Sequence, residues 1–252
     1  MSKIYKKAAH TITRLLLITL FSIPMSVYAE EPIKISAYTD YPPYLYHEDG
    51  KHTGLYIAIV DLTLDAIGQP YTLETVPFRR SLFQAAAGNG IVIGILKTDQ
   101  RAERLDFSKP IYQERVSVFF NHQKKPLIQS TDQLHGLNIG TLLGWSYGDN
   151  FDEARADSRF VTKDGELESN FHMLAKGRLD AVIHSELSAV SVINKLGLED
   201  EIFLGSEPLD LGNIHIAVKK GTQKALLDRI NRKLSEPAHQ KSIKSLIERY
   251  KK

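Results

Sequence analysis

Apolar and polar positions change period repeatedly along the chain, which predicts strands and helices in turn. A period of two is typical of a half-buried strand, and apolar residues at three- and four-residue spacing are typical of a helix. In the first half of the chain, strands are predicted at residues 33–38 and 71–76 and helices at residues 56–66 and 80–87. This strand–helix–strand–helix order implies a mostly parallel sheet.

A similar α/β unit begins again in the second half of the chain. Its strand-like segments are residues 116–120, 137–140, 177–183 and 214–218, and its helical segments are residues 171–175 and 226–250, the latter broken near Pro237. Two such units in succession, without low-complexity linkers between them, predict two lobes.

A buried strand predicted at residues 91–95 leads into a polar turn that contains Arg101. Open α/β sheets bind their ligands beyond the carboxyl ends of the strands. Arg101 is therefore a candidate anion receptor, because a guanidinium can hold a carboxylate through two hydrogen bonds. The alternative is a surface arginine paired with its near neighbours Asp99 or Glu103.

The residues around this turn carry a recognisable signature. Its members are Thr98, Arg101, Asp106, Phe107, Ser108, Pro110 and Tyr112. Their order and spacing resemble those of the extracellular solute-binding proteins of family 3, the periplasmic receptors for amino acids and related small molecules. Weaker matches extend the resemblance over the rest of the chain, at residues 41–44, 49–54, 134–136, 177–181 and 216–221.

The resemblance implies an α/β, two-lobed fold of the type II periplasmic-binding-protein class. The ligand cleft then lies between the lobes, which two crossover strands join. We expect lobe 1 to comprise residues 30–119 and 215–252 and lobe 2 to comprise residues 120–214.

The resemblance also implies a function that needs no chemistry, no cofactor and no metal. The protein would capture a small carboxylate-bearing ligand, an amino acid or a related compound, by hinge closure. It would then deliver the ligand, as a monomer, to the permease of an ABC transporter.

The amino terminus has the layout of a cleavable secretory signal. Basic residues precede an apolar core at residues 15–23, and small or neutral residues end at Ala29. We expect cleavage after Ala29, which predicts a periplasmic protein that is not embedded in the membrane. The chain has no cysteine, so it has no disulfide and no lipoprotein attachment point.

The charge balance argues against a nucleic-acid partner. Residues 1–29 hold four of the 32 Lys and Arg and none of the 30 Asp and Glu, so the remainder carries 28 against 30, a formal net charge of −2. The nine histidines are scattered without metal-binding spacing, and no nucleophile-elbow motif is present. A metal site and hydrolase chemistry therefore have no support.

The remaining candidate site residues follow from the resemblance and from their places after predicted strands. Tyr41 and Phe78 are candidates for stacking on the ligand, with packing on neighbouring side chains as the alternative for both. Ser146 aligns with a hydroxyl residue that binds the ligand's carboxylate, or it caps a helix. Trp145 belongs either to the cleft or to the core, and Gly94 lies in the strand before the arginine turn.

The departures from the family pattern concern the ligand. Leu96 stands where family members that bind α-amino acids have Ser or Thr, and Ser185 stands where they have the aspartate that pairs with the α-ammonium. Glu186 replaces that aspartate if the strand end is displaced; otherwise the ligand lacks an α-ammonium. Arg80 and its neighbour Arg79 either add positive charge to the cleft or remain solvated.

Two other functions fit the same fold. One is a periplasmic enzyme resembling cyclohexadienyl dehydratase, with Glu186 as the carboxylic acid catalyst. The other is a ligand receptor that reports to a sensor protein instead of a transporter.

Overall fold

The computed structural model describes residues 30–38, 40–121 and 130–250. The chain divides into two units, residues 1–30 and residues 31–252, and the fold described below is that of the second unit. The predicted signal peptide, residues 1–29, lies outside the described residues. Among the described residues, no helix is both long enough and apolar enough to cross a membrane.

Two long antiparallel strands, β7 (Tyr112–Asn121) and β12 (Asp210–Lys219), form the middle of the principal sheet. The described strands of this sheet follow the order β4, β1, β5, β12, β7, β10, β8, β9. The strands on the β12 side are β1 (Ile33–Ala37), β4 (Tyr71–Thr75), β5 (Ile91–Leu96) and β6 (Leu105–Phe107), the last of which pairs with β12. The strands on the β7 side are β8 (Asn138–Thr141), β9 (Val161–Asp164), β10 (Ala181–Ser185) and β11 (Ile202–Leu204), the last of which pairs with β7.

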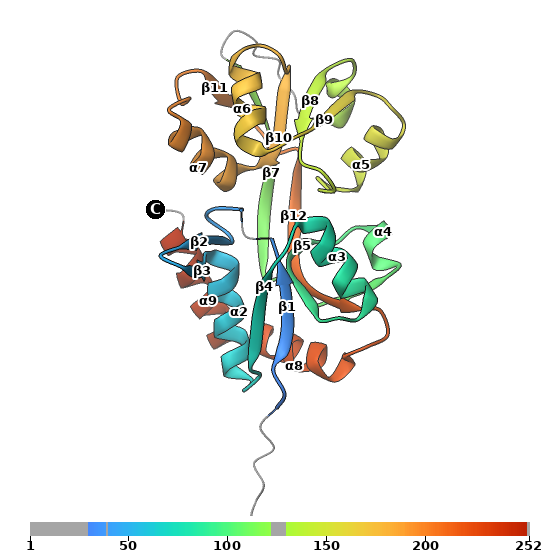
Figure 1. The fold of residues 1–252 in the computed structure, drawn as a ribbon, viewed down its shortest axis with the longest axis vertical. Coiled ribbons are helices and arrows are strands. Elements are labelled where there is room, and N and C mark those ends of the chain that lie inside the picture. Colours follow the sequence, from blue (N-terminus) through green and yellow to red (C-terminus); the bar gives the residue numbers. More distant parts are fainter. Residues whose placement is uncertain (1–29, 39, 122–129, 251–252) are drawn as a thin grey trace, which may run out of the picture. The chain divides into compact units, whose positions relative to one another are not determined.

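The two long strands connect two lobes (Figure 1). Residues 112–116 of β7 pair with β12, whereas residues 116–121 pair with β10 and β11. Likewise, residues 214–217 of β12 pair with β5 of the first lobe. The fold is therefore the two-lobed α/β fold expected from the sequence. The domain boundaries predicted at residues 119/120 and 214/215 fall inside these strands and stay a prediction.

Helices cover both faces of the sheet in each lobe (Figure 1). The first lobe contains α2 (Leu55–Ala66), α3 (Phe78–Ala87), the short α4 (Asp99–Ala102), α8 (Lys224–Leu234), α9 (Pro237–Tyr250) and the hairpin of β2 (Tyr46–Glu48) and β3 (Lys51–Thr53). The second lobe contains η1 (Thr131–Leu134), α5 (Asp149–Ala156), α6 (Leu167–Ala175) and α7 (Glu186–Leu196).

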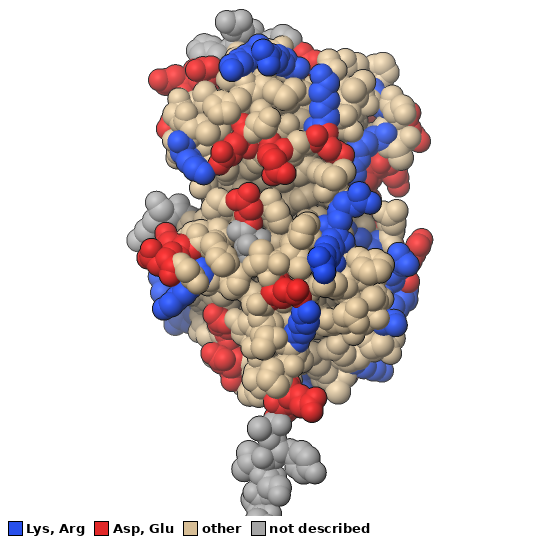
Figure 2. Space-filling view, viewed as in Figure 1, with Lys and Arg blue, Asp and Glu red and all other residues tan. Residues whose placement is uncertain are grey.

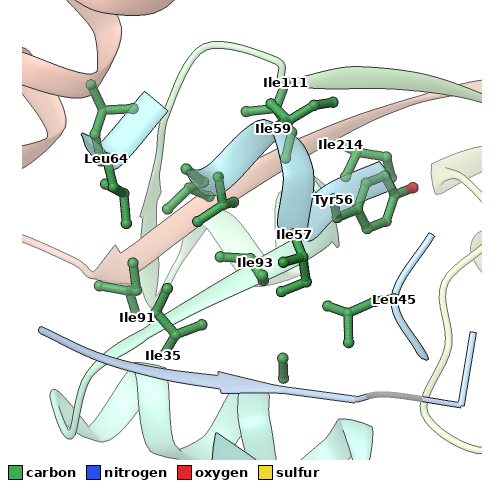
Figure 3. Close-up of a cluster of buried hydrophobic side chains, with 14 of the residues drawn as sticks. Ile35, Leu45, Tyr56, Ile57, Ile59, Leu64, Ile91, Ile93, Ile111 and Ile214 are labelled. Atoms are coloured by element: carbon green, nitrogen blue, oxygen red, sulfur yellow. The ribbon is translucent and has the colours of Figure 1, made fainter. Parts of the chain in front are cut away.

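The core of the first lobe lies between its parallel strands and α2, α8 and α9. Ile35 of β1 and Ile91 of β5 are fully buried beside Ile59 and Leu64 of α2 (Figure 3). Such a face, apolar on adjacent strands and on one stripe of a helix, removes its surface from water and stabilises the lobe. The opposite face of the same strands packs against α3 through Ala85.

The structure differs from the predicted elements mainly in the long strands and in two helices. The strand predicted at residues 116–120 begins at Tyr112, and the strand predicted at residues 214–218 begins at Asp210. These extra segments contain charged residues but pair with each other, so pairing between distant segments overrides their local composition. The helices α5 and α7 were not predicted. In α5 only Phe151 and Ala154 are buried, so the helical spacing is weak, whereas α7 has apolar residues at helical spacing that the prediction overlooked.

Candidate functional site

A cavity lies where the two long strands meet residues of both lobes. It encloses about 430 Å³ that protein atoms do not fill, part of it open to solvent. Its lining residues are Tyr41, Phe78, Gly94, Leu96, Arg101, Glu114, Val116, Trp145, Ser146, Tyr147, Ser185, Gly212 and Ile214. Seven of these are residues singled out from the sequence: Tyr41, Phe78, Gly94, Arg101, Trp145, Ser146 and Ser185.

Arg101 enters the cavity from α4, directly after β5. The Thr98 side chain caps this helix by accepting a hydrogen bond from the Arg101 backbone N–H at 3.2 Å. Nη1 of Arg101 donates to the Leu96 carbonyl at 2.8 Å, and its guanidinium carbon lies 5.4 Å from the centre of the Phe78 ring. Burial lowers the pKa of Arg101 to about 10, so the side chain remains a cation at neutral pH.

Arg101 has no carboxylate partner among the described residues. Asp99 and Glu103, the carboxylates that a surface arginine would pair with here, form no ion pair with Arg101 among the described residues. Asp152 and Asp149 act on this guanidinium only electrostatically, without a direct ion pair, so it can still pair with an anion that enters the cavity.

Glu114, which the sequence analysis did not single out, is the acidic residue of this cavity. It lies on β7 and is 5% exposed. The hydroxyl of Tyr41 donates to Oε2 of Glu114 at 2.8 Å, and the hydroxyl of Tyr56 donates to Oε1. Burial raises the pKa of Glu114 to about 8, against the lowering effect of the hydrogen bond from Tyr41.

A signal for Glu114 was present in the sequence. In a strand, residues two apart share a face, so Tyr112, Glu114 and Val116 alternate with the exposed Gln113 and Arg115. Recognising that signal required a strand that begins at Tyr112 rather than at residue 116. The charged composition of residues 113–115 concealed it.

Aromatic rings from both lobes form one wall of the cavity. The Trp145 ring lies 4.7 Å from Tyr41, 5.2 Å from Phe78 and 6.2 Å from Tyr38, measured between ring centres. Trp145 belongs to the loop between β8 and α5, whereas its three neighbours belong to the first lobe. The only tryptophan of the sequence therefore lies at the contact between the lobes.

The hydroxyl groups of the two serines in the cavity lining have different hydrogen-bond partners. Ser185, at the end of β10, donates to the Tyr44 hydroxyl at 2.9 Å and so connects the lobes. Ser146 donates to Oδ2 of Asp152 and accepts a 3.4 Å hydrogen bond from the Gly148 N–H. The N-cap residue of α5 is Gly148, so Ser146 is not the residue that caps this helix.

Two of the predicted site residues do not line this cavity. Arg80 is exposed on α3, where the helix turns it away from the strand end. Glu186 accepts a hydrogen bond from Ser117 at 2.6 Å and pairs with Arg115 at 2.8 Å. Ser117 and Arg115 face the side of β7 opposite to Glu114, because side chains alternate along a strand. Glu186 is therefore engaged away from the cavity.

His184 lies next to the cavity without any polar partner. It is fully buried, and among the described residues neither ring nitrogen has a hydrogen bond. Its ring lies 5.2 Å from Trp145 and 5.4 Å from Tyr41. Burial lowers the pKa of His184 to about 3, so the imidazole is neutral at physiological pH.

Gly94 allows the ring of Tyr56 to approach the strand. Its φ is +70°, and a Cβ atom at this position would lie 2.8 Å from Cδ2 of Tyr56. We therefore expect Gly94→Ala to lower the free energy of unfolding by about 2–3 kcal/mol, through backbone strain and displacement of that ring. Urea denaturation measures this loss.

The matched control for this substitution is Gly68→Ala. Gly68 has a similar φ of +68°, but nothing lies within 4 Å of its added Cβ. It should lose only the backbone contribution, about 1–2 kcal/mol. Equal losses in the two variants would contradict the role given to the contact between Gly94 and Tyr56.

No group of three or more His, Cys, Asp or Glu side chains in the described part of the chain is arranged to hold a metal ion. The site thus consists of one cation, one buried carboxyl group, several hydroxyls and a wall of aromatic rings. Such a set can bind a small polar molecule by charge, hydrogen bonds and stacking. Together with two lobes joined by two strands, it defines a two-lobed ligand-binding protein.

The chain belongs to the bacterial extracellular solute-binding proteins, family 3, whose sequence profile matches residues 33–252. It is similar to the probable amino-acid-binding protein YxeM of Bacillus subtilis strain 168, with 24% identity over 82% of this chain and 79% of that protein. It is also similar to the L-cystine-binding protein TcyJ of Escherichia coli K12, with 22% identity over 83% of this chain and 79% of TcyJ.

Solved structures share the fold. An ancestral arginine-binding protein bound to arginine has a TM-score of 0.75 and 22% identity, covering 88% of this chain and 99% of its own. A histidine kinase sensor domain with similarity to periplasmic binding proteins has a TM-score of 0.76 and 17% identity, covering 88% and 96%. The ancestral amino-acid-binding protein AncCDT-1, a precursor of cyclohexadienyl dehydratase, has a TM-score of 0.71 and 18% identity, with the same coverage.

Proposed function

We propose that this solute-binding protein captures a small carboxylate-bearing ligand, an amino acid or a related compound, in the cavity between its lobes. Arg101 holds the carboxylate, and contact of the ligand with both lobes stabilises the closed arrangement. The protein works as a monomer in the periplasm after loss of residues 1–29. It delivers the ligand to the permease of an ABC transporter.

The observation that carries this proposal is the guanidinium of Arg101. It lines the cavity and is half-buried, and no carboxylate of the described residues pairs with it. An entering carboxylate would satisfy this charge in a site from which closure excludes water, where an ion pair is stronger than at the surface. Further support comes from the relatives, which are named as amino-acid- and cystine-binding proteins.

The surroundings of the cavity also favour an anionic group. A neighbouring hollow shares Arg101, Trp145 and Ser146 with the cavity. Arg79, Arg104 and Arg155 also line it, together with the acidic Glu103 and Asp152, so basic residues are in excess. Figure 2 shows basic side chains gathered over α3, beside the junction of the lobes. Positive charge at an entrance attracts anionic ligands and speeds their association.

The experiment that tests the function combines ligand discovery with a signal from the cavity. Native mass spectrometry of the mature protein identifies any small molecule that copurifies, and a thermal-shift screen covers amino acids and organic acids. A ligand present at one hundred times its Kd should stabilise the protein by about 2.7 kcal/mol. No ejected molecule and no stabilisation by any carboxylate would contradict the proposal.

Trp145 provides the cavity signal because it is the single tryptophan of the chain. We expect its emission intensity or wavelength to change on ligand addition, with the same Kd as the thermal shift, because its ring contacts Tyr41 and Phe78 at the cavity wall. Trp145→Phe should lose the signal and retain binding. Stabilisation without any fluorescence change would mean that the ligand binds elsewhere.

The enzyme alternative retains one supporting observation. A dehydratase needs a carboxylic acid in the cavity. Glu186 pairs with Arg115 and does not line the cavity, whereas Glu114 does line it. Incubation with prephenate or arogenate distinguishes the two functions: product formation would establish the dehydratase, and unchanged substrate supports the binding protein.

A further inference from the structure

Glu114 lies in the floor of the cavity without a positive partner. Its carboxyl group accepts hydrogen bonds from Tyr41 and Tyr56, and it forms no ion pair within the described residues. A carboxylate removed from water is costly unless a cation or several donors compensate it. The hydroxyls of Tyr41 and Tyr56, with that of Ser185 also favouring the ionised form, compensate this one only in part.

Within the described part of the chain, the side chains that interact with Glu114 are uncharged hydroxyl groups. The loop before β2 contributes Tyr41 and Tyr44, α2 contributes Tyr56, and the end of β10 contributes Ser185. The two neighbours on its own strand face the other side, where Arg115 pairs with Glu186.

The nearest basic residue that shares the cavity is Arg101, whose Nη1 is bound to the Leu96 carbonyl. Among the ion pairs of the described residues, none joins Arg101 to Glu114. The cavity therefore contains one cationic and one acidic side chain that do not neutralise each other. Space that protein atoms do not fill adjoins both of them.

This arrangement matches a molecule that carries both charges. We propose that Glu114 is the second charged anchor of the site and pairs with a protonated amine of the ligand, while Arg101 holds its carboxylate. The inference rests on the proposed function and narrows it: the ligand is a zwitterion such as an α-amino acid, and not a simple carboxylic acid. Glu114 lies on a strand that connects the lobes, so this contact places the amine at the hinge.

The hydrogen bonds from the tyrosines allow Glu114 to give up its proton when a ligand amine binds. Burial raises the pKa of Glu114 to about 8, so without a ligand the carboxyl group holds a proton at neutral pH. An ammonium favours the ionised form, and Tyr41 and Tyr56 remain as donors to it. Binding of an amino acid should then release a proton, whereas binding of a carboxylate that lacks the amine should not.

The test compares each L-amino acid with the carboxylic acid that lacks only its amino group. In the wild type, calorimetry should show at least tenfold tighter binding of the amino acid. Glu114→Gln keeps the shape of the side chain but not its charge, and it should weaken amino-acid binding at least tenfold while changing that of the carboxylic acid less than threefold. Glu199→Gln, the same substitution at an exposed position on the second lobe, should change neither.

The outcomes separate this inference from the function on which it rests. If carboxylic acids bind as tightly as the amino acids, or if Glu114→Gln weakens both equally, Glu114 is not an amine anchor although the carboxylate site remains. If no carboxylate of either kind binds, the proposed function fails as well.

A second measurement uses the wild type alone and does not depend on the variant folding. Calorimetry of amino-acid binding at pH 7, in phosphate and in Tris buffer, measures the protons released from the difference in buffer ionisation enthalpy. With a pKa of about 8, roughly nine-tenths of a proton should leave the protein. Binding without proton release would overturn the inference.

Discussion

Replacing Arg101 by alanine is expected to weaken ligand binding about 100-fold or more. Truncating one partner of a buried, hydrogen-bonded charge pair typically costs ~2–5 kcal/mol, and each 1.4 kcal/mol is a factor of about ten in Kd. The expected loss is therefore large enough to abolish the thermal shift at ligand concentrations that stabilise the wild type. Calorimetry and the thermal shift measure it.

The unliganded variant should stay folded. The guanidinium of Arg101 makes one side-chain hydrogen bond, to the Leu96 carbonyl, and stacks on Phe78. Its removal should therefore change the free energy of unfolding by only about 1 kcal/mol. Equal Kd values for the variant and the wild type would remove Arg101 from the binding site.

Two further variants identify which property of Arg101 matters. Arg101→Lys keeps the charge but not the planar pair of donors, so its affinity should fall between those of the wild type and the alanine variant. Arg232→Ala, at an exposed position on α8, controls for the loss of a positive charge and should bind as the wild type does.

The stability of the protein is expected to be highest between about pH 4.5 and 6.5 and to fall on both sides. Two buried groups, Glu114 in the cavity lining and His184 beside the rings of Tyr41 and Trp145, produce opposite slopes. The expected loss on each side is about 2 kcal/mol, because a proton taken up or released on unfolding changes its free energy by about 1.4 kcal/mol per pH unit. Urea denaturation from pH 3 to pH 8 measures the profile.

Glu114 accounts for the loss at higher pH. Its pKa rises from 4.5 to about 8 on folding, so between these values the folded protein holds a proton that the unfolded chain has released. Its contribution is fully present below pH 4.5 and is lost as the pH rises through 8. Glu114→Gln should flatten this part of the profile.

His184 accounts for the loss in acid. Its pKa falls from 6.5 to about 3 on folding, so between these values the unfolded chain holds a proton that the folded protein excludes. Its contribution is fully present above pH 6.5 and is lost as the pH falls toward 3. His184→Phe should remove this slope and keep a ring against Tyr41 and Trp145.

Between pH 4.5 and 6.5 the two slopes cancel, because folding binds one proton at Glu114 and releases one at His184. His172→Asn, on the exposed face of α6, is the control for loss of a histidine. A wild-type profile that declines steadily across the whole range, or one that neither variant alters, would contradict this account.

Local patterns in the sequence predicted many of the strands and helices and some of the residues that line the cavity. An apolar run followed by a polar turn indicated strand β5 and the turn with Arg101. The helix predicted at residues 80–87 is α3, which ends at Ala87 as expected. The motif around Arg101 led to the correct family, whose profile covers residues 33–252. These features depend on residues that are close together along the chain, so the sequence alone is enough to predict them.

The remaining features of the site depend on contacts between distant segments. Glu186 was predicted to replace the family's ammonium-binding aspartate if the strand end is displaced, whereas pairing of β10 with β7 sets it against Arg115 and Ser117. Glu114 became a buried acid because β12, about 100 residues further along the chain, pairs with its strand and Tyr41 and Tyr56 close over it.

The sequence by itself thus determined the class of fold and the family, and it predicted Arg101, which the structure places in the lining of the cavity. Only the tertiary structure decided which ionisable groups are buried without an ionic partner, as Glu114 and His184 are among the described residues, and which form an ion pair, as Glu186 does with Arg115. The physical reason is that local composition indicates whether a segment forms a strand or a helix. The register between distant strands decides what each side chain faces, and hence its charge state.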